Sequence, residues 1–242
     1  MTASWSPTAR EKDALQRHAQ VQKLLRVDAV WPWLADRHGA IAALDAPHAA
    51  HPERFNFGEL AERIATAAAA FRRNGVNKGD VVALFAENSP RWLVADQGLM
   101  RAGAADAVRG ASAPVEELRY ILMDCRATAL VVQNAEVWRR VALAPDQRAK
   151  LRFVLQLEGE PAEGAIGWEA FLASGAGLDP VRLARGRDAV ATVLYTSGTT
   201  GQPKGVPLTH ANLLHQMSSL ACVAYPEPGA PVLSVLPIWH AY

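Results

Sequence analysis

Short apolar segments alternate with segments of helical periodicity along most of this chain, and this alternation limits its fold more than any other feature. The clearest helical segment, residues 58–73, places its apolar side chains on one face and ends at Asn74-Gly75. Short apolar strands are expected over residues 81–86, 104–108, 128–132, 153–157, 190–195 and 232–236. Helices between successive strands permit parallel pairing. The sequence therefore predicts an α/β fold with mostly parallel sheets flanked by helices.

Further helices are expected over residues 6–27, 89–101, 114–122, 136–143, 168–173 and 209–222. Ser6-Pro7 is interpreted as the start of the first one, because proline suits the first helical position. Residues 158–164 and 174–177, which are rich in Gly, Glu and Pro, are expected to form surface loops.

Composition excludes several classes of protein. Half of the 242 residues are hydrophobic and 20% are charged, so the chain can bury a core and is not disordered. The formal charge is +1, from 25 basic and 24 acidic residues, and we expect no nucleic-acid partner. Cys125 and Cys222 form no paired motif, which indicates a reducing, cytoplasmic location.

Neither a membrane span nor a histidine metal site is expected. No stretch reaches the ~18 apolar residues of a transmembrane helix, and residues 1–26 lack the apolar segment of a secretory signal. We expect a soluble protein, with peripheral membrane contact left open. His210 and His215 are five positions apart, on different faces of a helix. His210 is interpreted as the residue that merely follows a helix cap at Thr209.

The strongest chemical signal lies between Val193 and His210. An apolar strand is followed by a loop that is dense in glycine and hydroxyl residues and contains Lys204, and then by a helix capped by Thr209. The glycines let backbone N–H groups converge, the hydroxyls add donors, and Lys204 adds a positive charge, which together suit a polyphosphate. The alternative interpretation is a solvated turn with Lys204 in water.

Three better-known motifs do not fit this loop. A Walker loop requires Gly-Lys-Ser/Thr, but Lys204 stands between Pro203 and Gly205. The dinucleotide fingerprint GxGxxG is absent. A nucleophile elbow requires glycine where Tyr195 stands, so Ser197 is not interpreted as a hydrolase nucleophile.

The loop, residues 195–206, resembles the phosphate-binding signature of the adenylate-forming superfamily, which includes acyl-CoA synthetases, adenylation domains and luciferases. Residues 57–60, 79–84 and 87–92 resemble the N-terminal half of that superfamily. Residues 108–110, 114–120 and 236–242 are similar to its long-chain fatty acid branch, which loads CoA or acyl carrier protein. One departure is Ala111-Ser112, where that branch has Ser-Asp after Arg-Gly.

The resemblance implies ATP-dependent activation of a long-chain fatty acid to an acyl-adenylate, followed by transfer to CoA or acyl carrier protein, with ATP and Mg²⁺ as cofactors. It also implies roles for single residues. His240 would lie near the acyl carboxylate and adenylate as a catalytic residue, Trp239 beside the acyl channel, and Thr196 on the magnesium side. The triphosphate would be surrounded by Thr196, Ser197, Gly198, Thr199, Thr200, Gly201 and Lys204.

Simpler interpretations of some residues stay open. His240 can instead be a surface histidine at a strand end, with Trp239 packed in a core. Tyr195 either contacts the nucleotide or fills the sheet. The position of residues 236–242 just past an expected strand favours the functional interpretation, since ligands of open α/β sheets bind there.

Two regions are expected: an N-terminal helical extension over residues 1–30, and the N-terminal portion of an AMP-binding domain over residues 31–242. We expect the chain to be an incomplete domain that lacks the family's C-terminal domain and is inactive alone. Two alternatives remain open. One is adenylation of another carboxylic acid, such as an amino or aryl acid, and the other is a non-catalytic nucleotide-binding module.

Overall fold

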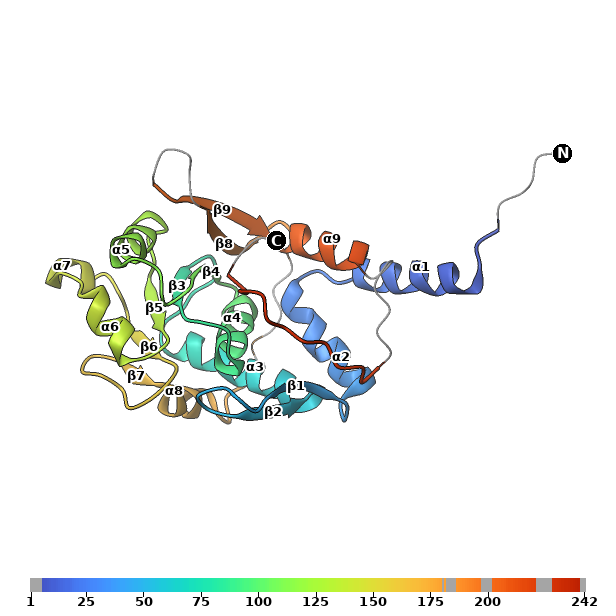
Figure 1. Ribbon diagram of the computed structural model, residues 1–242, viewed down its shortest axis with the longest axis horizontal. Helices are drawn as coiled ribbons and strands as arrows, with labels where there is room; N and C mark the ends of the chain where they lie inside the picture. Colours follow the sequence, from blue (N-terminus) through green and yellow to red (C-terminus); the bar gives the residue numbers. More distant parts are fainter. Residues whose placement is uncertain (1–5, 180, 182–185, 197–201, 221–227, 240–242) are drawn as a thin grey trace.

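The computed structural model describes residues 6–179, 181, 186–196, 202–220 and 228–239. Its central sheet has seven strands: β3 (Val81–Phe85), β4 (Ala105–Arg109), β5 (Ala129–Val132), β6 (Val154–Gln156), β7 (Ile166–Gly167), β8 (Val190–Thr196) and β9 (Lys204–Thr209). Their order is β7-β6-β5-β3-β4-β8-β9 (Figure 1). Neighbouring strands pair in parallel except β8 and β9, which pair antiparallel. The predicted α/β class is therefore confirmed.

The helices and a separate hairpin surround this sheet. The hairpin joins β1 (Ala42–Ala46) to β2 (Glu53–Asn56). The helices are α1 (Ala9–Gln22), a short 3₁₀ turn η1 (Val27–Ala29), α2 (Val30–His38), α3 (Phe57–Arg73), α4 (Pro90–Ala102), α5 (Val115–Asp124), α6 (Ala135–Val141), α7 (Pro145–Arg148), α8 (Trp168–Gly175) and α9 (His210–Leu220). None of these helices is long and apolar enough to cross a membrane, as judged over the described residues.

Two hydrophobic cores lie on opposite faces of the sheet. Helices α3, α4 and α8 cover one face, and α5 and α6 cover the other. On the first face the rings of Phe71 and Phe171 meet edge to face with centroids 4.7 Å apart, and Phe153 packs against both. Burial of such rings is a large share of the stabilising apolar area.

Local capping signals start the helices at defined residues. Asn56 and Glu59 form a capping box on α3, and Ser89 caps α4 with Pro90 in its first turn. The first helix departs from expectation, because Thr8 and Glu11 form its capping box and α1 begins at Ala9 rather than near Ser6. A threonine followed three residues later by glutamate provides two reciprocal hydrogen bonds.

The strand order reverses beside β3. Strand β4 lies on one side of β3 and β5 on the other, so the crossovers through α4 and α5 cover opposite faces. In open α/β sheets, ligands bind outside the carboxyl ends of the strands at such a reversal. The carboxyl ends of β3, β4 and β8 are therefore the edge where a site is expected.

The strand expected over residues 232–236 is not formed. This segment has no regular secondary structure, and its apolar side chains are exposed, with Leu233 86% exposed. A β-strand requires a neighbouring strand for its backbone hydrogen bonds, and none of the described strands pairs with these residues. The segment is apolar, as a strand would be, but an apolar sequence pattern does not by itself provide a strand to pair with.

Candidate functional site

Two paired strands flank the glycine- and hydroxyl-rich segment of the sequence. Strand β8 ends at Thr196 and β9 begins at Lys204, and these two residues are direct partners in the antiparallel ladder. Cross-strand partners project their side chains to the same face of a hairpin, and both residues are exposed. Lys204, predicted to lie within the loop, is instead the first residue of a strand. Ser197, Gly198, Thr199, Thr200 and Gly201 lie outside the described residues.

Tyr195 packs inside the sheet. Only 4% of its surface is exposed, and its hydroxyl donates a 2.7 Å hydrogen bond to Asp124 Oδ2 at the end of α5. Burial, together with this hydrogen bond, raises the pKa of the Tyr195 hydroxyl. A Cβ added to Gly205 would lie 3.0 Å from the Tyr195 ring, so glycine leaves room for the ring beside β9. Of the two open interpretations of Tyr195, packing is the one that the described contacts support.

Residues just past β3 and β4 hold the segment that contains Trp239. The side-chain amide of Asn88 donates to the Leu236 carbonyl at 2.8 Å and accepts from the Ile238 amide at 3.1 Å. One side chain thus fixes the backbone on both sides of Pro237. These hydrogen bonds connect positions about 150 residues apart, which no local pattern reveals.

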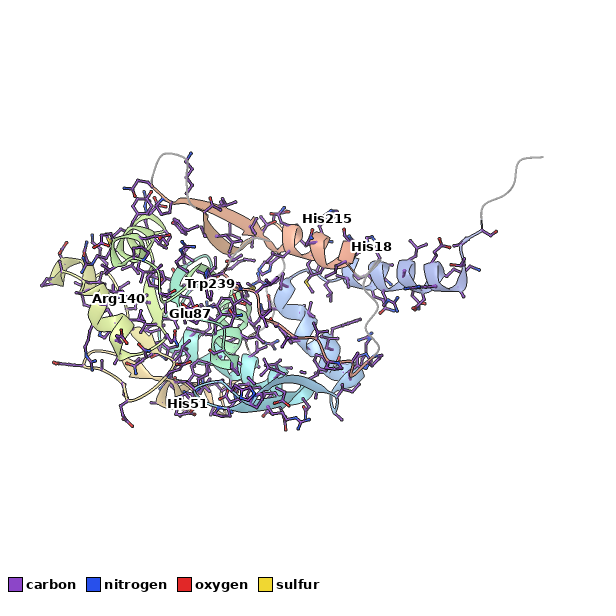
Figure 2. The ribbon with its side chains drawn as sticks, viewed as in Figure 1. His18, His51, Glu87, Arg140, His215 and Trp239 are labelled. Atoms are coloured by element: carbon purple, nitrogen blue, oxygen red, sulfur yellow. The ribbon has the colours of Figure 1, made fainter. Side chains whose placement is uncertain are left out.

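Gly110 provides space for the indole of Trp239. A Cβ on Gly110 would lie 2.8 Å from the Trp239 ring and 3.2 Å from Glu87 Oε1, and Figure 2 shows Glu87 and Trp239 at this edge. The Glu87 carboxylate accepts a 3.1 Å hydrogen bond from the Ser112 amide. Trp239 therefore lies at the edge where the strand order reverses, and it also packs against the hydrophobic core on the α3–α4 face, as the packing interpretation expects. The predicted catalytic residue His240 lies outside the described residues.

A cavity of about 480 Å³ lies between α4, the sheet and α9, next to this segment. Ile238 lines it, and so do Val27 and several other apolar residues. These include Trp92, Met100, Val108, Leu194, Leu208 and Leu213. Its volume is within the range of about 300–1,000 Å³ that small-molecule sites occupy.

One of two neighbouring buried carboxyl groups lines the cavity. Asp96 on α4 lines it, and Asp106 on β4, which is fully buried, lies beside Asp96 and is paired in register with Thr192. Gln97 Nε2 donates to Asp96 Oδ2 at 2.6 Å. Burial raises the pKa of Asp96, and burial together with the negative charge of Asp96 raises the pKa of Asp106 well above its usual range.

Neither Asp96 nor Asp106 was among the residues predicted to form a site. An aspartate in the middle of an apolar strand, Asp106 between Ala105 and Ala107, was a usable signal. Its partner could not be found in the same way, because the contact with Asp96 depends on how α4 packs on the sheet. Within the described part of the chain, no group of three or more His, Cys, Asp or Glu residues could hold a metal ion.

Comparisons with known proteins agree on one family. The profile described as AMP-binding enzyme matches residues 32–242. The chain is 37% identical to a probable acyl-activating enzyme 16, chloroplastic, of Arabidopsis thaliana, over 89% of this chain and 32% of that protein. It is 38% identical to a long-chain-fatty-acid–[acyl-carrier-protein] ligase of the same organism, with the same coverage.

More distant relatives and solved structures show the same relationship. A long-chain-fatty-acid–CoA ligase of Mycobacterium tuberculosis is 32% identical over 75% of this chain and 31% of that protein. The crystal structure of a long-chain-fatty-acid-CoA ligase from Archaeoglobus fulgidus superposes with a TM-score of 0.70 at 27% identity, covering 82% of this chain and 39% of that one. The chain spans about a third of the length of the curated relatives it matches.

Proposed function

Because this chain belongs to the AMP-binding enzyme family, we propose that it provides the triphosphate-binding hairpin and an acyl cavity for the ATP-dependent activation of a long-chain fatty acid. In this reaction a carboxylate oxygen attacks the α-phosphate of ATP, the bond to the β-phosphate breaks, and pyrophosphate leaves. The acyl-adenylate then reacts with a thiol of CoA or acyl carrier protein, and AMP leaves. Relatives that load either acceptor support this substrate class.

The observation on which the proposal depends is the pairing of Lys204 with Thr196 at the end of β8. Both exposed side chains lie on one face of the hairpin, directly beside the glycine- and hydroxyl-rich segment of the sequence. The Lys204 ammonium would stabilise the negative charge that accumulates on the β- and γ-phosphates as the bond to the α-phosphate breaks. Ser197, Gly198, Thr199, Thr200 and Gly201 would contribute hydroxyl and backbone donors.

Thr196 would face the metal side of the triphosphate. When bound, Mg²⁺ neutralises phosphate charge and is coordinated largely by phosphate oxygens and water. A single threonine hydroxyl would then be enough as the contribution of this strand end to the site.

The fatty acid would extend into the cavity of about 480 Å³ lined by apolar residues of α4, the sheet and α9. Trp239 and Ile238 connect this cavity to the carboxyl ends of β3 and β4, so a chain in the cavity could present its carboxylate near the hairpin. We assign His240, one residue past Trp239, to the carboxylate and adenylate.

Two measurements test this function. The first is equilibrium binding to the purified chain: we expect Mg–ATP to bind in the absence of palmitate, and palmitate to bind in the absence of Mg–ATP. The second is ATP–pyrophosphate exchange that depends on palmitate. We expect the longest natural polypeptide that contains this sequence to catalyse it. Absence of Mg–ATP binding to a folded chain would refute the triphosphate site, and exchange driven by an aryl or amino acid but not by palmitate would refute the fatty-acid assignment.

A further inference from the structure

One wall of the cavity comes from outside the family-matched region. Most of its lining belongs to α4, the sheet and α9, but Val27 also lines it, on η1. Val27 precedes residue 32, where the family match begins. The N-terminal part of the chain thus contributes directly to the surface that an acyl chain would contact.

The backbone at Val27 is fixed by a buried histidine. The Val27 amide donates a 3.2 Å hydrogen bond to Nδ1 of His210, the first residue of α9. None of the His210 side chain is exposed, so this acceptor is sheltered from water. A hydrogen bond to a buried group without a competing water molecule holds its partner firmly in place.

The neighbours of Val27 are held by a buried ion pair. Arg26 Nε donates to Asp28 Oδ1 at 2.9 Å, and a second guanidinium nitrogen of Arg26 donates to the Met100 carbonyl of α4. Arg26 is 3% exposed and Asp28 is fully buried. Breaking a buried pair leaves an uncompensated charge, so its geometry is strongly maintained. Val27 is therefore held from both sides, to α4 and to α9.

Helix α1, which precedes Val27 in the sequence, also contacts α9. His18 Nδ1 lies 3.0 Å from the Ser218 carbonyl oxygen, and Gln22 Nε2 donates to the Ser218 hydroxyl at 2.9 Å. Arg187 donates a further 3.0 Å hydrogen bond to the Gln22 carbonyl. Figures 1 and 2 show α1 meeting α9, with His18 and His215 at the junction. The contacts at Val27 are thus part of a longer interface.

We propose that Val27 is a specificity-determining residue that sets the acyl chain length accepted by the cavity, with Arg26, Asp28 and His210 as its positioning residues. This inference rests on the proposed function, because it assigns an acyl chain to the cavity. A larger side chain at position 27 reduces the space available to the chain, and a smaller one extends it. One methylene group more or less in a hydrophobic pocket changes discrimination between ligands by about 10- to 200-fold, so one side chain in the lining can shift the preferred chain length.

The test compares binding of laurate, palmitate and stearate to Val27→Phe, Val27→Leu, Val27→Ala and the unmodified chain. Val27→Phe should weaken palmitate and stearate binding about tenfold and laurate less than about twofold. Val27→Leu should give a smaller shift in the same direction, and Val27→Ala should favour stearate about threefold. Leu25→Ala is the matched control, since Leu25 is exposed and does not line the cavity.

Unchanged Mg–ATP binding in every variant would show that the hairpin is intact. If the unmodified chain binds fatty acids but the Val27 variants keep its chain-length profile, or weaken all three acids equally, this inference is wrong and the proposed function stands. If the unmodified chain binds no fatty acid while still binding Mg–ATP, the acyl assignment itself fails and this inference fails with it.

Discussion

The hydroxyl of Tyr195 donates a 2.7 Å hydrogen bond to Asp124, which joins the strand before the glycine-rich loop to the end of α5. The contact lies one residue before Thr196, so it fixes the point where the hairpin leaves the sheet. Asp124 is exposed and can be solvated, whereas Tyr195 is buried. The tyrosine therefore anchors the hairpin and leaves phosphate contact to the residues that follow.

Replacing Tyr195 with Phe should lower the free energy of unfolding by about 1 kcal/mol, because one hydrogen bond is lost while the ring keeps its packing. Urea denaturation measures this change. Tyr120→Phe is a matched control, since its hydroxyl lies 3.5 Å from the same carboxylate and should contribute less. Equal losses in the two variants would contradict an anchoring role for Tyr195.

Replacing Lys204 with Ala should weaken Mg–ATP binding about tenfold, because one charge-assisted contact to the phosphates is removed. Lys204→Arg should retain part of the affinity. Lys78→Ala is the control, since Lys78 is exposed beside the amino end of β3, at the opposite edge of the sheet. Calorimetric titration measures all three variants, and identical affinities for Lys204→Ala and Lys78→Ala would remove Lys204 from the proposed site.

Replacing Asn88 with Ala should release residues 236–238, because both hydrogen bonds of the amide are lost. Limited proteolysis should then cut residues 228–239 several-fold faster, as expected for a locally less stable segment. Asn88→Asp keeps the acceptor for the Ile238 amide but loses the donor to Leu236, so an intermediate rate is expected. Asn77→Ala is the control, because it removes an exposed side-chain amide elsewhere in the chain. An unchanged cleavage rate in Asn88→Ala would refute the positioning role of Asn88.

His210 should make stability depend on pH in the acid range. Burial, with a smaller effect of the Arg26 charge, lowers the pKa of His210 from 6.5 to about 4. As the pH falls, His210 therefore binds a proton in the unfolded chain before it does so in the folded chain. The free energy of unfolding decreases as the pH falls from about 6.5 to about 4. His210→Asn should flatten this part of the unfolding profile relative to the unmodified chain. His215→Asn, an exposed position on the same helix, should leave the slope unchanged.

Asp106 should make the folded state less stable as the pH rises, the opposite of the dependence expected for His210. Its pKa is raised well above the usual range by burial and by Asp96, so the folded state holds a proton that the unfolded state releases. Its contribution to stability is present below about pH 4 and is lost as pH rises through the folded pKa. Asp106→Asn should therefore be more stable than the unmodified chain at about pH 8 and show no such gain at about pH 4. Thermal unfolding at both values tests this, with the exposed Asp36→Asn as control.

Local signals were sufficient for the fold class and for the position of the glycine-rich loop. The alternation of apolar strands and amphipathic helices, and caps such as Ser89 before α4, depend on neighbouring residues and can be identified in the sequence. Strand β9 was missed because its glycine and proline, Gly205 and Pro207, are typical of a loop, and only its pairing with β8 stabilises it as a strand. The strand prediction for residues 232–236 was wrong. Their apolar pattern is typical of a strand, but none of the described strands pairs with them.

The sequence by itself determined the α/β class, the glycine- and hydroxyl-rich segment after the strand that ends near Tyr195, and the resemblance to the family, because each depends on residue types at fixed short spacing. Only the tertiary structure decided which distant residues meet: Asn88 with the backbone beside Trp239, Asp106 with Asp96, and Val27 with His210. These contacts join different elements of the fold, so their energies arise from packing and from burial away from water. No local pattern encodes that geometry, and Val27 forms a wall of the cavity only because η1, α4 and α9 pack together.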